Sequence, residues 1–195
     1  MKQAHALWLL GGTSMLTLAT VGWLGYRVYT QSIAPQPVEI PKDLLASRQP
    51  SPEAAQAGAD ALLAMTLPDL EGRPQSLAQW RGKVLVINYW ASWCAPCVEE
   101  MPALSRLHAH YAPWGVQFVG VGLDAAENLR TFVKTTPVTY PLLVGGADPG
   151  QTPGLVVKGL PYTIVLGRDG KVDTAHLGRL DESTLEPVIR RLLGQ

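Results

Sequence analysis

Two cysteines, Cys94 and Cys97, are the side chains of this 195-residue chain best suited to chemistry, and the chain has no others. They stand in the run C-A-P-C, three positions apart. Two thiols at this spacing can close a disulfide with each other and reopen it by thiol–disulfide exchange. A lone pair is not the multi-bridge framework that stabilises small secreted domains. The composition therefore favours thiols that are kept for reactivity.

The surrounding pattern explains why these thiols would be reactive. Val84–Trp90 is a nearly continuous apolar run, typical of a strand that is buried on both faces, and a helical stretch follows from Ala95 to about His110. The first turn of a helix has unpaired N–H groups and a partial positive charge, which stabilise a thiolate. We therefore expect Cys94 to be exposed and nucleophilic. Cys97, one turn later, should be more buried and should attack the mixed disulfide.

Two metal-dependent uses of a C-x-x-C motif fit this sequence poorly. A structural zinc site needs four ligands, and there is no second cysteine pair. His108 and His110 follow Cys97 at a distance of ~16 Å or more along one helix. Covalent haem attachment needs a histidine directly after the second cysteine, where this chain has Val98. We expect no metal and no separate cofactor, with the Cys94–Cys97 disulfide as the redox group.

The rest of the chain after the amino-terminal region alternates between strand and helix patterns. The predicted elements are strands at Ala64–Leu67 and Gln75–Leu77, a strand at Val116–Leu123, a helix at Ala125–Thr135, a strand at Leu142–Val144, a helical turn at Gly150–Val157, strands at Thr163–Leu166 and Lys171–Leu177, and a helix from Asp181 to Gly194. Strand–helix alternation followed by a hairpin and a closing helix predicts an α/β domain of three layers.

The amino terminus carries a long apolar segment. No charged side chain occurs from Ala6 to Tyr26, and ~20 apolar residues match the thickness of a bilayer core. A cleavable signal has a shorter apolar region, and Pro35 follows the only plausible cleavage site. We favour an uncleaved anchor over a signal, and both export the rest of the chain. The predicted organisation is a membrane anchor at 1–30, a proline-rich linker at 31–58 and a globular domain at 59–195, with a short helix around Glu53–Leu63, where alanine and leucine favour it.

Charge argues against one class of partner. Lysine plus arginine number 16, as do aspartate plus glutamate, and no basic stripe stands out. Nucleic-acid binding depends on clustered cations that neutralise phosphates. We therefore expect no nucleic-acid partner.

The run W-A-S-W-C-A-P-C resembles the active-site segment of thioredoxin. The longer pattern from Leu67 to Pro102 resembles the TlpA/ResA branch of membrane-anchored bacterial thioredoxin-like proteins, and the resemblance covers about residues 60–192. It implies a thioredoxin-like fold, with a central mixed sheet, helices on both faces and the TlpA-type central insertion of a strand and a helix. It also implies one transmembrane helix in the bacterial inner membrane, with the domain facing the periplasm or the outside.

The resemblance assigns roles to residues around Gly159-Leu160-Pro161-Tyr162. It implies that Pro161 follows a cis peptide bond and faces the dithiol, and that Leu160 pairs with the substrate backbone. From its position alone, Pro161 would be a trans proline at the start of a strand. The resemblance also implies that Pro102 kinks the helix after the cysteines, where the alternative is a helix that ends at Met101.

Glu100 is the candidate proton carrier. It lies three residues after Cys97 and so shares a helix face with both cysteines. A partly buried carboxylate there would have a raised pKa and move protons to or from Cys97, and the resemblance includes a glutamate at this position. Thioredoxin has its buried acid six residues before the first cysteine, where this chain has Asn88. The alternative is a solvated surface glutamate, which we expect for Glu99.

Two further side chains are open to interpretation. Trp93, beside Cys94, either lines a substrate surface or packs against the domain. His176, on a late strand, is expected to be structural.

The leading hypothesis is an enzyme that reduces disulfides in exported proteins, fed with electrons by a membrane thiol reductase. The resemblance implies cytochrome c maturation as one pathway, although G-V-x-G-x-P-E of that subgroup is replaced here by V-K-G-L-P-Y. A Cu(I)-binding chaperone would also use two thiolates, but the cysteine spacing and the position of His176 argue against it. A disulfide-forming oxidase would share every residue of the site, because direction depends on the reduction potential.

Overall fold

The computed structural model describes residues 23–24, 26–27, 29, 49–147 and 159–195. The chain divides into two compact units, Met1–Pro41 and Lys42–Gln195. Most of the predicted anchor, and the helical turn expected at Gly150–Val157, lie outside the described residues. Within those residues, no helix is both long enough and apolar enough to cross a bilayer.

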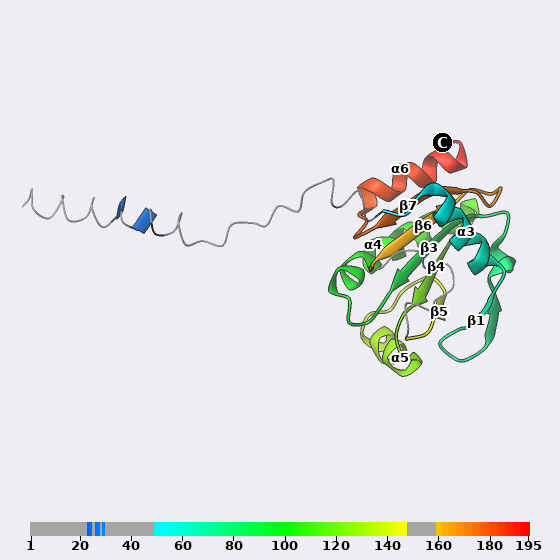
Figure 1. The fold of residues 1–195 in the computed structure, drawn as a ribbon, viewed down its shortest axis with the longest axis horizontal. Helices are drawn as coiled ribbons and strands as arrows, with labels where there is room; N and C mark the ends of the chain where they lie inside the picture. Colours follow the sequence, from blue (N-terminus) through cyan, green and yellow to red (C-terminus); the bar gives the residue numbers. More distant parts are fainter. Residues whose placement is uncertain (1–22, 25, 28, 30–48, 148–158) are drawn as a thin grey trace, which may run out of the picture. The chain divides into compact units, whose positions relative to one another are not determined.

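A mixed five-stranded sheet forms the centre of the second unit, with strand order β5-β4-β3-β6-β7 (Figure 1). Its strands are β3 (Val84–Trp90), β4 (Val116–Gly122), β5 (Leu142–Val144), β6 (Tyr162–Leu166) and β7 (Val172–Leu177). The first three run parallel to one another, whereas β6 and β7 are antiparallel to their neighbours. A separate hairpin joins β1 (Thr66–Pro68) and β2 (Pro74–Ser76). Each predicted strand is thus confirmed, with its ends within two residues of the expected positions.

The helices connect these strands and cover the sheet. They are α3 (Pro52–Leu63), α4 (Ala95–Tyr111), α5 (Ala126–Thr135) and α6 (Glu182–Leu193), with short 3-10 turns η1 (Leu77–Trp80) and η2 (Ala112–Trp114). Along the chain, helix α5 and strand β5 come after β4 and before β6. This is where the resemblance implied an extra helix and strand.

Strand β3 shows how the sequence produces three layers. All seven of its residues are buried, because the side chains alternate between two apolar clusters. Val84, Val86 and Trp90 pack in a cluster that includes side chains of α4, α5 and α6. The intervening residues pack in a second cluster with α3 and η1. The predicted α/β domain with helices on both faces of a mixed sheet is therefore confirmed.

Helix α4 carries both cysteines and continues beyond its internal proline. Cys94 is the N-cap residue, and Pro96 stands in the first turn, where no intrahelical donor is lost. The helix runs through Pro102 to Tyr111. The alternative in which it ended at Met101 is therefore wrong.

The predicted boundary between linker and domain, at residues 58 and 59, is also wrong, because it falls inside α3. Ser51 caps this helix by accepting a hydrogen bond from the Ala54 backbone N–H at 3.2 Å. Ala55 and Ala59 are both completely buried. Pro52 is the first residue of α3, a position that proline favours. A proline that suggested a linker therefore begins a helix of the domain.

Two glutamine amides attach this amino-terminal segment to the outer edge of β7. The Gln49 amide accepts from the Leu177 N–H at 2.8 Å and donates to the Leu177 carbonyl at 3.2 Å. The Gln56 amide likewise accepts from the Val172 N–H at 2.8 Å and donates to the Gly170 carbonyl at 3.2 Å. The domain therefore includes the chain from at least Gln49 onward.

We predict that a chain starting at Ala59 is less stable than one starting at Lys42. The shorter chain loses the buried Ala55 side chain and the bonds of Gln49 and Gln56, which we expect to lower the free energy of unfolding by about 2–4 kcal/mol. Urea denaturation of both chains measures the difference. Equal midpoints and slopes would show that the segment before Ala59 does not belong to the folded domain.

Candidate active site

The two cysteines form a disulfide at the amino-terminal end of α4, with their Cα atoms 5.3 Å apart. Cys97 is completely buried and Cys94 is 6% exposed. The predicted order of burial is therefore confirmed, but the expectation that Cys94 is exposed is wrong for the disulfide form. The reason is tertiary packing, because Cys94 belongs to the same apolar cluster as Ala91 and Cys97.

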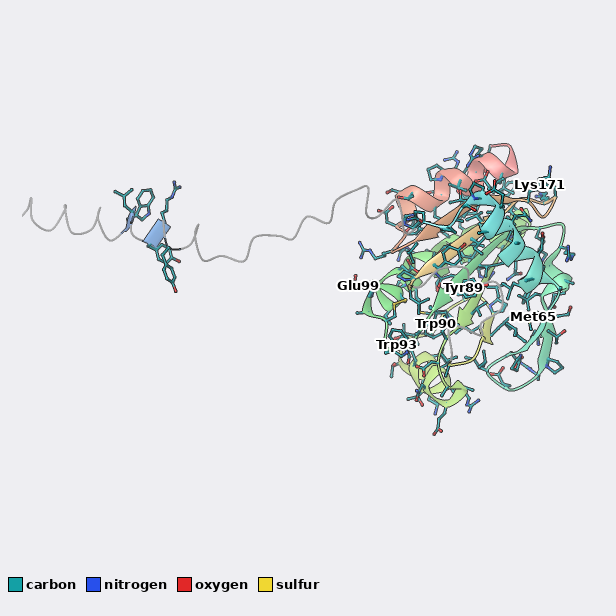
Figure 2. All side chains as sticks on the ribbon, viewed as in Figure 1. Met65, Tyr89, Trp90, Trp93, Glu99 and Lys171 are labelled. Carbon is teal, nitrogen blue, oxygen red and sulfur yellow. A yellow bond between two sulfur atoms is a disulfide. The ribbon has the colours of Figure 1, made fainter. Side chains whose placement is uncertain are left out.

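A tight turn connects β3 to the disulfide. The backbone N–H of Cys94 donates to the Ala91 carbonyl at 3.1 Å, and the Cys94 carbonyl then accepts from the Cys97 N–H at 3.0 Å. This geometry turns the Trp93 side chain outward, where it is 67% exposed (Figure 2). Trp93 therefore does not pack in the core, and it adds an apolar surface beside Cys94.

The peptide bond between Leu160 and Pro161 is cis, as the resemblance implied. Tyr162 follows directly and pairs with Tyr89 near the end of β3, so β6 begins at the sheet end where the disulfide lies. Leu160 packs against the apolar cluster that contains Cys94 and Cys97. The fold thus brings the predicted proline segment and the disulfide to the same end of the sheet.

Glu100 is a buried carboxylate that is 2% exposed. One carboxylate oxygen accepts from Asn88 Nδ2 at 2.7 Å, and the other accepts from the Leu180 backbone N–H at 2.9 Å. Burial raises the pKa of Glu100 to about 7, although the bonds from Leu180 and Asn88 and the charge of Arg179 oppose the rise. A carboxyl with this pKa gains and loses a proton near neutrality. This is the environment that was expected for Glu100.

Its neighbour Glu99 is a solvated surface residue, as expected, with a side chain that is 61% exposed and 3.0 Å from Arg179. The two adjacent glutamates therefore differ sharply. Only Glu100 lies on the helix face that also carries the buried Cys97.

Asn88 connects Glu100 to the proline segment. Its Nδ2 atom donates to Glu100 and also, at 3.1 Å, to the hydroxyl of Thr163, two residues after Pro161. An amide at this position is neutral at every relevant pH, so it orients the carboxylate without competing for its proton. Glu100 is therefore the titratable member of this network.

Sequence reasoning missed one polar pair at the site, Ser92 and Asp124. The Ser92 hydroxyl donates to one oxygen of Asp124, whose other oxygen accepts from Ala125 N–H and Asn128 Nδ2, each at 2.7 Å. Burial raises the pKa of Asp124, but the bonds from Ser92, Asn128 and Ala125 outweigh it and hold the pKa below its usual range. An ionised carboxylate thus fixes the turn before Cys94. The sequence signal that could have identified this pair is an acidic residue, Asp124, directly after the apolar run that forms β4.

Among the described residues, neither His176 nor His108 is grouped with possible metal ligands. His176 on β7 pairs in register with Thr163, and burial lowers its pKa, which favours the neutral ring. His108 on α4 lies 3.2 Å from the Thr139 hydroxyl. In the described ranges, no three histidine, cysteine or acidic side chains are grouped as metal ligands would be.

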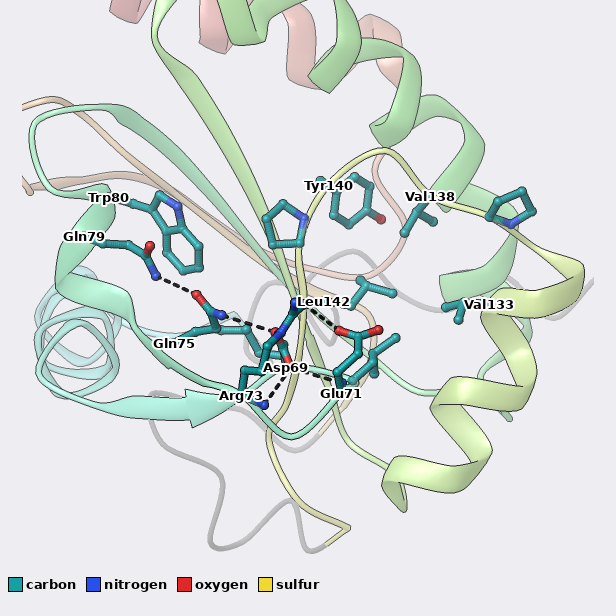
Figure 3. Close-up of a pocket in the computed structure, with 14 residues that line it drawn as sticks. Asp69, Glu71, Arg73, Gln75, Gln79, Trp80, Val133, Val138, Tyr140 and Leu142 are labelled. Atoms are coloured by element: carbon teal, nitrogen blue, oxygen red, sulfur yellow. Dashed lines mark hydrogen bonds and ion pairs between the residues drawn. The ribbon is translucent and has the colours of Figure 1, made fainter.

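A surface pocket of about 590 Å³ lies away from the disulfide, between the β1–β2 hairpin and β5 (Figure 3). Its polar side is organised by Asp69, which accepts hydrogen bonds from Arg73 and Gln75 at 2.8 and 3.2 Å. Trp80 and Tyr140 are among its apolar lining residues. None of the predicted site residues lines it.

A disulfide at the start of a helix, preceded by a buried central strand and accompanied by a cis-proline at the same sheet end, defines a thiol–disulfide oxidoreductase of thioredoxin-like fold. Known proteins agree with this class. The Redoxin family model matches residues 56–190. The thioredoxin-like protein YneN of Bacillus subtilis is 29% identical over 183 residues, which cover 92% of this chain and 94% of YneN.

Two more relatives bear the activity in their names. The thiol–disulfide oxidoreductase ResA of Halalkalibacterium halodurans is 30% identical over 134 residues, covering 68% of this chain and 74% of ResA. The crystal structure of a putative thiol:disulfide interchange protein DsbE from Chlorobium tepidum superposes with a TM-score of 0.60 and 34% identity, covering 67% of this chain and 93% of that one. The chain belongs to the Redoxin family, within its TlpA/ResA-like group of thioredoxin-family thiol–disulfide oxidoreductases.

We predict that Glu100 makes the protein less stable as the pH rises from about 4.5 to about 7. In this interval the unfolded chain has released the proton that folded Glu100 still holds, so the free energy of unfolding falls by about 3 kcal/mol. Glu100→Gln should remove this part of the pH dependence. Urea denaturation across the interval measures it.

Glu99→Gln is the matched control, because Glu99 is exposed, and it should keep the wild-type pH dependence. An unchanged pH dependence in Glu100→Gln would contradict the raised pKa.

Proposed function

We propose that this enzyme works as a reductase of disulfides in exported proteins. The Cys94 thiolate attacks a client disulfide, forming a bond between Cys94 and one client sulfur and releasing the other client sulfur, which takes up a proton. Cys97 then attacks Cys94, closing the Cys94–Cys97 disulfide and releasing the second client thiol. Two electrons pass from the pair to the client. The disulfide in the structure corresponds to the enzyme after this turnover.

The observation that carries the proposal is the buried carboxylate one helical turn after a completely buried Cys97. Cys97 must lose its proton before it attacks Cys94, because the thiolate is the nucleophile. Solvent does not reach Cys97, so an internal base is required. Glu100, with a pKa of about 7, accepts this proton near neutrality and returns it when the pair is reduced again.

Client binding is assigned to the surface around Cys94. Trp93 offers an exposed indole, and the Leu160 backbone stands at the start of β6, directly before the cis-proline. We propose that an extended client segment pairs with the Leu160 backbone and that the indole packs against it. Backbone pairing supplies affinity for many client sequences, since it does not depend on side chains.

The apolar segment at 6–26 supports a proposal for the cellular setting. We propose a single-pass anchor in the bacterial inner membrane, with the catalytic domain in the periplasm or outside. A membrane thiol reductase would supply electrons by reducing the Cys94–Cys97 disulfide. Apocytochrome c, whose cysteines must be reduced before haem attachment, is the first client to test. This chain has V-K-G-L-P-Y where the cytochrome-maturation subgroup has G-V-x-G-x-P-E. Other exported proteins are therefore equally important candidate clients.

We predict that Cys97→Ser captures clients as mixed disulfides. This variant keeps the Cys94 nucleophile and loses the thiol that would release the client. Non-reducing electrophoresis of the envelope fraction, followed by mass spectrometry of the Cys97→Ser adducts, identifies the captured proteins. Cys94→Ser is the control and should capture far fewer. Equal capture by both variants would contradict the assignment of Cys94 as the attacking cysteine.

We predict that Trp93→Ala lowers kcat/KM for a protein disulfide roughly tenfold while exchange with dithiothreitol is unchanged. The loss of one exposed aromatic contact removes ~1.4 kcal/mol of client binding. Trp114→Ala is the matched control, because Trp114 is 58% exposed beyond the other end of α4. A parallel loss with dithiothreitol would show that Trp93 acts on the disulfide itself.

A further inference from the structure

Three buried polar atoms on one face of the sheet have no hydrogen-bond partner within the described part of the protein. They are Asn88 Oδ1, Trp90 Nε1 and the Tyr140 hydroxyl. Their residues are 1%, 0% and 5% exposed, respectively. Buried polar groups in folded proteins nearly always have a partner, which is either protein or ordered water. Three such atoms in one region therefore point to a binding site.

Gly120 brings the three residues together. A Cβ atom built on Gly120 would lie 2.5 Å from Cδ2 of Leu142, 3.1 Å from Trp90 Nε1 and 3.3 Å from Cε2 of Tyr140. Asn88 is the residue of β3 that pairs with Gly120 in register, and Trp90 lies two residues later on the same face of that strand. Because Gly120 has no side chain, Leu142, Trp90 and Tyr140 can pack closely against the sheet beside Asn88.

Tyr140 is also close enough to Glu100 to feel its charge. Burial and then the Glu100 carboxylate raise the pKa of the Tyr140 phenol. On the other sides of Glu100 stand the Asn88 amide, the Leu180 N–H and the charged Arg179. Asn88 and Tyr140 therefore lie near the carboxylate, and Asn88 both carries an unpartnered oxygen and donates to Glu100.

The chemistry of the three atoms is complementary. Asn88 Oδ1 only accepts, the indole Nε1 only donates, and the tyrosine hydroxyl does both. One water molecule can donate to Asn88 and to Tyr140 and accept from Trp90. Buried waters typically make about three hydrogen bonds of this kind.

We propose that an ordered water molecule bridges Asn88 Oδ1, Trp90 Nε1 and the Tyr140 hydroxyl. The water holds the Asn88 amide with its oxygen toward Tyr140 and its NH₂ toward Glu100. It thereby maintains the bond that stabilises the ionised carboxylate. Asn88 and Tyr140 are positioning residues, because they act on the reaction through Glu100. The consequence for catalysis rests on the proposed proton transfer by Glu100, whereas the water site itself does not.

The first test measures the pKa of Glu100 in full-length Tyr140→Phe by carboxyl ¹³C NMR. The substitution removes only the hydroxyl, so the water loses one of its three partners and the ionised carboxylate loses support. We expect the pKa of Glu100 to rise by about half a unit or more. An unchanged pKa would overturn the proposal, because a hydroxyl that only packs has no influence on Glu100.

Tyr162→Phe is the matched control. Tyr162 also has a buried hydroxyl without a partner in the described residues, but its side chain packs in the apolar cluster on the opposite face of the sheet. This substitution should leave the pKa of Glu100 unchanged. A rise equal to that in Tyr140→Phe would show that the effect is general, and would overturn the proposal.

The second test is a crystal structure of the protein at high resolution. We expect a water peak about 3 Å from all three atoms in the wild type and not in Tyr140→Phe. Well-ordered side chains with no peak between them would overturn the proposal. Activity of Glu100→Gln separates the two proposals. Suppose that Glu100→Gln reduces clients normally, while the wild type shows the water peak and Tyr140→Phe shows the raised pKa of Glu100. The water site would then stand, and the proposed role of Glu100 would fail.

Discussion

The hydrogen bond from Asn88 to Glu100 is the interaction on which the rest of the site depends. It joins the central strand β3 to helix α4 inside an apolar core, at 2.7 Å. The same amide bonds Thr163 on β6, and the second oxygen of Glu100 bonds the Leu180 N–H before α6. One carboxylate and one amide thus connect two strands, helix α4 and the loop before α6. A buried carboxylate without these partners would be strongly destabilising.

This arrangement makes the two cysteines unequal. Cys94 lies at the helix N-cap beside the exposed Trp93, where a client disulfide can approach. Cys97 lies inside, where a thiol cannot exchange its proton with solvent directly. Because Cys97 is buried, its proton transfer calls for a carrier inside the protein. In the proposed mechanism Glu100 is this carrier, because burial raises its pKa while the bonds from Leu180 and Asn88 keep its ionised form accessible.

The parts of the fold that local pattern determines were predictable. Val84–Trp90 is apolar at nearly every position, and α4 begins directly after a short turn. The cis bond before Pro161 followed from family resemblance, since position alone indicates a trans proline. Glu100 could be singled out because helical spacing places it on the face of Cys97.

Other features depend on contacts between distant segments, which local pattern does not reveal. The bond from Ser92 to Asp124 spans 32 residues, and the bonds from Gln49 to Leu177 span 128. The near-complete burial of Cys94 in the disulfide form arises from tertiary packing. A short helix around Glu53–Leu63 was predictable from its alanines and leucines, but only its packing partners reveal that it belongs to the domain and not to a linker. The partners of Asn88 likewise become visible only when β3, α4 and β6 are assembled.

The most direct test of the account is the reduction potential of the Cys94–Cys97 pair in the full-length protein, measured by equilibration against glutathione or dithiothreitol buffers. A reductase that receives electrons across the membrane should have a potential well below about −200 mV, near the thioredoxin end of the known range. A potential near about −120 mV, typical of strong protein oxidants, would contradict the reductase assignment and indicate that the enzyme forms disulfides in its clients.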